Sequence, residues 1–166
     1  QYPIAYLQYI GLLLMGGDPE AAADGAARLD ELQSVYEDMD GIPVKRKNRV
    51  LAEIQSIRIF AVFNDAEKIV ACANEALRLL DGGPSVLLKR ENEFTFGSPH
   101  FLYSYYREPG RLKETADFMA ESFPSAGLLA NGLGAGCEYL TLGEYALETG
   151  DETAAELSAF KAIYKA

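Results

Sequence analysis

A turn signal recurs along this chain every 40 to 47 residues, and this recurrence restricts the folds that the chain can adopt. The four signals are Gly17-Asp18-Pro19, Asn64-Asp65-Ala66, Pro109-Gly110-Arg111 and Gly150-Asp151-Glu152. Measured from residues 17, 64, 110 and 150, they lie 47, 46 and 40 residues apart. Such a spacing accommodates two helices and two loops per unit. Because one helix pair cannot bury its apolar side alone, the pattern predicts pairs stacked against one another.

Small residues return at fixed distances after these turns. Three alanines lie nine residues beyond turn starts and two lie twelve residues beyond: Ala26, Ala73 and Ala159, then Ala76 and Ala162. The unit that begins at residue 110 follows this register only loosely, with Ala116 and Ala120 placed differently. Small side chains let neighbouring helices approach closely, so the register also favours stacked helix pairs.

The 3.6-residue period of apolar positions gives the expected helices. They lie near residues 4–15, 19–39, 46–63, 66–80, 99–107, 111–122, 134–149 and 151–165. Asp18, Asp65 and Asp151 are expected to cap the helices that follow them, because their carboxylates can accept bonds from free amide groups. The irregular part is 82–100, where Ser85 could cap a short helix, and no segment gives a convincing strand. We therefore expect an all-α superhelix of about four helix pairs over residues 1–166.

The net charge of −10 disfavours direct contact with nucleic acid, because binding to phosphates depends on a concentrated basic face. A single basic cluster stands out, formed by Lys45, Arg46, Lys47 and Arg49. It is interpreted as a solvated first turn of a helix, and a docking point for an acidic partner or another domain is the alternative. The sequence has no apolar run long enough to span a membrane and no signal peptide pattern, so we expect a cytoplasmic protein.

Catalytic chemistry has few possible participants here. His100 is the only histidine, so neither a His-paired metal site nor a triad with a histidine base can be assembled. Cys72 and Cys137 each lie within an apolar helical pattern, which favours two buried, reduced thiols over a bridge or a metal pair. We expect no catalytic residues, no metal and no cofactor.

Two stretches resemble known repeat proteins. Residues 139–151, with Leu142-Gly143 and Gly150-Asp151, followed by Ala155 and Ala162, look like a tetratricopeptide repeat. The aromatic stretch 94–110, followed by Gly-Ala-Gly-Cys-Glu-Tyr-Leu at 134–140, resembles the helical-repeat region of LuxR-type transcriptional regulators of the MalT-like class. The resemblance covers essentially all 166 residues.

This resemblance implies a fragment of a larger bacterial regulator. Such regulators join a P-loop ATPase, a winged helix, a helical-repeat sensor and a helix-turn-helix DNA reader. Only the sensor region is matched, since the sequence has no G-x-x-x-x-G-K-[ST] motif to hold ATP phosphates and no basic recognition helix. The implied function is a non-catalytic sensor that binds a small inducer or the neighbouring domains. The alternative is a stand-alone adaptor of the tetratricopeptide type that docks a peptide or protein segment.

The candidate ligand site is the aromatic segment and one acidic residue of the following helix. Its expected members are Phe96, His100, Tyr103, Tyr106, Arg107 and Glu138. Aromatic faces with polar tips suit a sugar, a peptide or a flat metabolite, and an arginine suits a carboxylate or phosphate. The competing interpretation is that the rings fill the space between helix layers.

Three alternate glycines before the last helix pair could be mistaken for a dinucleotide motif. Gly132, Gly134 and Gly136 do not follow a strand, so the context of a phosphate-binding turn is missing. They are expected to permit close backbone packing, while Glu138 lies near the positive end of a helix or pairs with a neighbour such as Arg107.

Overall fold

The computed structural model describes residues 2–88 and 101–166, and this part of the chain is all-helical. It contains seven α-helices and one short 3₁₀ helix, and no strand. The helices are α1 (Pro3–Met15), α2 (Pro19–Asp38), α3 (Val44–Ala61), α4 (Ala66–Leu79), η1 (Leu102–Ser104), α5 (Leu112–Leu129), α6 (Cys137–Glu148) and α7 (Glu152–Lys165). The expected all-α class is confirmed.

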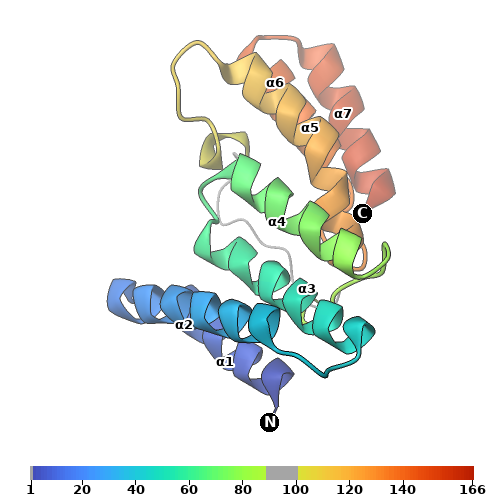
Figure 1. Ribbon diagram of the computed structural model, residues 1–166. Helices are drawn as coiled ribbons and strands as arrows, with labels where there is room; N and C mark the ends of the chain where they lie inside the picture. The colour runs from blue at the N-terminus through green and yellow to red at the C-terminus, as the bar shows by residue number, and fades with distance from the viewer. Residues whose placement is uncertain (1, 89–100) are drawn as a thin grey trace.

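The helices stack in chain order into a superhelical array (Figure 1). Figure 1 shows α1 and α2 at one end, α3 and α4 in the middle, and α5, α6 and α7 at the other end. Each α-helix packs against the next one along the chain, and α1 also packs against α3. Three helix pairs are therefore complete, α1–α2, α3–α4 and α6–α7, and α5 stands between the second and the third.

The apolar interior is divided into three clusters in series instead of one central core. The first joins α1, α2 and α3 around Leu7, Leu29 and Ile54, all fully buried. The second joins α3, α4 and the end of α5, and the third joins α4, η1, α5 and α6 around Met119. Neighbouring clusters share a helix, so each helix pair is stabilised by the elements beside it, as in other repeat arrays.

The three expected aspartate caps are confirmed. The Asp18 carboxylate accepts a bond of 3.0 Å from the amide of Glu20, at the start of α2. Asp65 and Asp151 do the same for α4 and α7, at 3.1 and 2.9 Å. The turn that contains Gly110 differs, because Arg111 makes no side-chain cap to α5.

Two expected helices are corrected. The helix expected over 99–107 is, in its described part, only the single 3₁₀ turn η1, and the preceding α-helix that packs against α5 within the described residues is α4. The helix expected to end at residue 122 continues to Leu129, with Pro124 inside it. The extension buries Leu129 completely in the second cluster, and this packing outweighs the backbone bond that the proline removes.

The recurring alanines have unequal surroundings. Ala73 and Ala76 are fully buried on α4, as the register predicts, whereas Ala159 is exposed on α7. Glycines also permit close contacts between paired helices. A Cβ at Gly25 of α2 would lie 3.3 Å from the side chains of Leu13 and Leu14 on α1, which is tighter than ordinary van der Waals contact, so the glycine makes this close packing easier.

Two buried glutamates hold loop segments against the helices by hydrogen bonds. Glu53 of α3 is fully buried and accepts bonds from the Ser85 hydroxyl and the Val86 amide, at 2.5 and 2.9 Å. Ser85 in turn accepts the amides of Leu87 and Leu88, yet no helix follows within the described residues. Buried carboxylates are tolerated only when hydrogen-bonded, so this loop has one favoured position against α3.

Glu144 of α6 has the same role at the other end of the array. Its carboxylate accepts the backbone amides of Phe101 and Leu102, at 2.6 and 2.5 Å, and it is buried. Both residues belong to the third cluster. The carboxylate thus fixes the entry into η1 over a separation of more than forty residues in sequence.

Replacing Glu144 by alanine should therefore lower the free energy of unfolding by about 2–4 kcal/mol, because two buried amides lose their acceptor. Chemical denaturation followed by circular dichroism measures this loss. Glu121→Ala, an exposed change on α5, serves as the control and should cost less than about 0.5 kcal/mol. Equal stability of the two variants would contradict the role given to Glu144.

Burial also sets the acidity of two groups in the third cluster. Both cysteines are free and buried, as expected. Burial raises the pKa of the Cys137 thiol from 9.0 to about 12 and the pKa of the Tyr105 hydroxyl from 10.0 to about 12. Loss of either proton would leave an anion among apolar side chains.

Alkaline pH should consequently destabilise the fold. Because both pKa values are raised in the folded state, their contribution is complete below about pH 9 and is lost as pH rises toward 12. Urea midpoints measured between pH 7.5 and 11.5 should fall across this window, and Cys137→Ala should make the fall shallower. A urea midpoint that does not change with pH would show that neither group ionises more readily in the unfolded chain.

Candidate functional site

Two of the expected site residues, Phe96 and His100, lie outside the described residues. Tyr103, Tyr106 and Arg107 do lie together beside η1, with the rings of Tyr103 and Tyr106 edge to face at 6.0 Å. The Arg107 guanidinium donates to the carbonyl oxygens of Tyr103, Ser104 and Tyr106. The Tyr106 hydroxyl accepts the amide of Gly110 at 3.0 Å. Arg107 and Tyr106 therefore bind and stabilise the turn that carries them.

Other rings of the same segment belong to the core. Phe101 and Tyr105 are buried and contact Phe123 of α5 at centroid distances of 5.7 and 5.3 Å. The aromatic segment is thus divided: these two rings fill the space between layers, whereas Tyr103 is exposed. The hydrogen bond between Tyr103 and Glu148 raises the pKa of the tyrosine.

The remaining expected residue, Glu138, lies in the first turn of α6 and its partner is Lys165 of α7. The pairing with Arg107 considered from the sequence is not found, since Arg107 is engaged with backbone oxygens. The Glu138 side chain is 11% exposed and that of Lys165 is 48% exposed. The hydrogen bond to Glu138 raises the pKa of Lys165, which keeps this ammonium charged.

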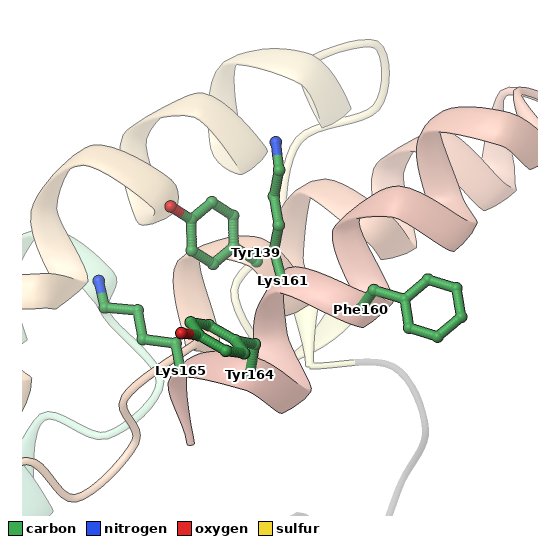
Figure 2. A pocket seen from close by; sticks show the side chains of 5 residues that line it. All are labelled: Tyr139, Phe160, Lys161, Tyr164 and Lys165. Carbon is green, nitrogen blue, oxygen red and sulfur yellow. The ribbon is translucent and has the colours of Figure 1, made fainter.

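Next to this ion pair lies an open hollow of about 640 Å³ between α6 and α7 (Figure 2). It is lined by Tyr139, Phe160, Lys161, Tyr164 and Lys165. Figure 2 shows the two ammonium groups on different sides of the Tyr139 ring, with the Phe160 ring projecting outward. We call these five residues the α6–α7 hollow.

The two lysines give the hollow a local positive charge. Their Nζ atoms lie 5.7 Å (Lys161) and 5.6 Å (Lys165) from the centre of the Tyr139 ring, within the range of cation–π attraction. Glu138 neutralises Lys165, whereas Lys161 makes no ion pair with any described residue. One uncompensated ammonium beside exposed rings can attract a carboxylate or phosphate whose neighbouring atoms are apolar.

Small residues hold α7 at the distance that forms the hollow. A Cβ at Gly143 of α6 would lie 3.3 Å from the Ser158 Cβ, and one at Gly136 would lie 2.5 Å from the Ala162 carbonyl oxygen. Gly136 also has a φ of +91°, a left-handed conformation that other residues rarely adopt. The glycines at 132–136 follow α5 and no strand, so the context for dinucleotide binding is missing. The expected close packing is found at Gly136, whereas a Cβ at Gly132 would meet nothing within 4 Å.

Gly136→Ala should therefore destabilise the chain by about 2–4 kcal/mol, because the new methyl group meets backbone and the left-handed conformation is strained. Thermal unfolding gives the size of the loss. Gly110→Ala has the same conformational strain, but its new methyl group meets no atom within 4 Å. The difference in stability between the two variants therefore gives the cost of the steric contact with α7. Identical melting temperatures would mean that α7 does not pack closely at this point.

The sequence interpretation missed the hollow, although α7 carries a readable signal for it. Alanines and a serine at 154, 155, 158 and 162 form one side of the helix, and large apolar residues at 157, 160, 163 and 164 form the other. A helix with one apolar neighbour needs only one such side. Two non-polar sides indicate that α7 has a second surface available for binding.

The described residues contain no group of three or more His, Cys, Asp or Glu side chains that could hold a metal ion. Among the same residues, no helix has the length and apolar character needed to cross a membrane. Comparisons with family models, with curated proteins and with solved structures found no match to this chain.

Proposed function

We propose that this chain is a non-catalytic sensor or interaction domain of a larger cytoplasmic regulator of the LuxR type, MalT-like class, and that it binds its partner at the α6–α7 hollow. One observation carries the binding proposal: the Lys161 ammonium, which forms no ion pair with a described residue, lies beside the Tyr139 ring in a concave surface with exposed aromatic side chains. The partner would present an anionic group next to apolar surface. The regulator class is supported by the sequence resemblance.

Other features support binding over catalysis. The buried carboxylates Glu53 and Glu144 are occupied by backbone amides and a hydroxyl, so neither is available as a general acid or base. Burial raises the pKa of both thiols, which makes them poor nucleophiles at neutral pH. Beside the hollow, Glu138 and Lys165 are paired with each other, and this ion pair holds two opposite charges together instead of placing a base next to a nucleophile.

A stand-alone adaptor of the tetratricopeptide type is the second candidate. It is favoured by the packing of α1 against both α2 and α3, in which one helix pair covers the next. Sequencing the whole reading frame separates the two candidates. The regulator predicts a P-loop upstream and a helix-turn-helix downstream in the same frame, and a frame without them would favour the adaptor.

Binding at the hollow can be tested by thermal shift against sugars, amino acids and short peptides. A ligand present at a hundred times its Kd should stabilise the fold by about 2.7 kcal/mol, which is roughly 5–10 °C in melting temperature for a chain of this size. Carboxylate- or phosphate-bearing compounds should give the largest shifts.

The matched variants are Lys161→Ala, which removes the ammonium beside Tyr139, and Lys113→Ala, an exposed change of equal charge on α5. The first should lose most of the shift and the second should keep it. An equal shift in melting temperature for both variants would place the binding elsewhere on the array. The absence of any shift with all anionic compounds would count against the proposal.

A further inference from the structure

The residues that follow α5 include the only Asn-Gly pair in the sequence, Asn131-Gly132. The side-chain amide of an asparagine can be attacked by the backbone nitrogen of the next residue, and glycine hinders this attack least because it has no Cβ. Asn131 is exposed to solvent, so water can reach its side chain. This helix end therefore carries the groups needed for a spontaneous covalent modification.

The structure holds the attacking nitrogen in a hydrogen bond. Asn131 has a left-handed φ of +54°, and its amide donates to the Leu128 carbonyl oxygen at 3.2 Å. The Gly132 amide donates to the Gly127 carbonyl oxygen at 2.8 Å. These two bonds form the Schellman motif that ends α5. The Gly132 nitrogen must lose its proton before it can attack, and in this motif a carbonyl oxygen holds that proton.

A contact from another loop fixes the end of α5. The Ser85 amide donates to the Leu129 carbonyl oxygen at 2.8 Å, and the Ser85 hydroxyl donates to the buried Glu53 carboxylate of α3. Leu129 is itself fully buried. Figure 1 shows the end of α4, from which this loop continues, close to the end of α5. The Schellman motif can therefore open fully only when Leu129 separates from the loop at Ser85.

We propose that Asn131 is a site of spontaneous deamidation, and that the contacts from Glu53 through Ser85 to Leu129 control its rate. Once the motif opens, the Gly132 nitrogen gives its proton to solvent and attacks the Asn131 Cγ atom. The new N–Cγ bond closes a succinimide ring, and the Cγ–Nδ2 bond breaks as ammonia leaves. Water then adds to either carbonyl carbon of the ring and opens it, which yields an aspartate or an isoaspartate.

The end of α4 has the same backbone arrangement with a different side chain. Asp81 has a φ of +52°, and the Gly82 amide donates to the Leu77 carbonyl oxygen at 2.8 Å. An ionised carboxylate is a poorer target than a neutral amide, because its charge repels the nitrogen anion that attacks it. Asp81 thus serves as an internal comparison, with similar backbone protection and slower chemistry.

Deamidation would weaken the array at the point where α5 ends. Either product places a carboxylate at the carboxyl end of the helix, where the helix dipole disfavours negative charge. An isoaspartate also lengthens the backbone by a carbon atom within the Schellman motif. Leu129 and Ala130 belong to the second apolar cluster, so the modified chain should have a lower melting temperature than the unmodified one.

The test is peptide mapping of the whole chain by mass spectrometry during incubation at mildly alkaline pH. Aspartate and isoaspartate should accumulate at residue 131 at least about tenfold more slowly in the folded chain than in urea, because the motif must open first. Asn74, which is followed by a glutamate within α4, should stay unmodified in the folded chain.

Two variants separate opening of this helix end from unfolding of the whole chain. Glu53→Ala removes the acceptor of the Ser85 hydroxyl and should speed deamidation of the folded chain by about three- to tenfold. Glu144→Ala removes a buried acceptor at η1 instead and should change the rate by less than about twofold. If Glu53→Ala does not fold, Ser85→Ala removes the same hydrogen bond and repeats the comparison.

Three outcomes would overturn the inference. Equal acceleration by Glu53→Ala and Glu144→Ala would mean that modification follows unfolding of the whole chain. Equal rates in the folded chain and in urea would mean that the Schellman motif gives no protection. Faster modification at Asn74 than at Asn131 would mean that the Asn-Gly pair is not the reactive site.

Discussion

Apolar burial in this chain is shared between neighbouring helix pairs, and the other features of the structure depend on that constraint. Leu29 and Ile54 lie in the cluster between α1, α2 and α3, and Leu129 and Met119 lie in the two clusters that follow. Among the described residues, no helix pair has an apolar cluster of its own, so each cluster stabilises the neighbouring elements that share it. The same constraint explains why large apolar side chains are exposed on the outer side of α7, which has no such neighbour among the described residues: Leu157, Phe160, Ile163 and Tyr164.

Hydrogen bonds and close backbone contacts fix the positions of loops and helices that apolar packing alone does not determine. Glu53 and Glu144 fix the segments that begin at Ser85 and Phe101, and each is positioned by a helix in the interior of the array. Gly136 and Gly143 then set the distance between α6 and α7. The hollow is a consequence of this close approach, since it brings Lys161 and Lys165 to the Tyr139 ring.

Local chemistry made much of the fold predictable. Asp18, Asp65 and Asp151 were identifiable as caps because their bonds lie within three residues. The end of α5 was not predictable, because the burial of Leu129 against distant helices outweighs the local effect of Pro124. Of the candidate site residues, Glu138 accepts a hydrogen bond from Lys165, which lines the hollow, while Arg107 donates to backbone oxygens of the turn that carries it. The roles of Glu53 and Glu144 depend on partners more than thirty residues away, which periodicity cannot indicate.

Native-state hydrogen exchange, resolved helix by helix, tests the central claim that stability is passed between neighbours. α7 contributes no residue to the three clusters and contacts chiefly α6. Its amides should therefore exchange through local opening, faster than those of α3, which belongs to two clusters. Exchange of α7 and α3 at one common, global rate would contradict the account, because it would mean that the chain unfolds as a single closed unit.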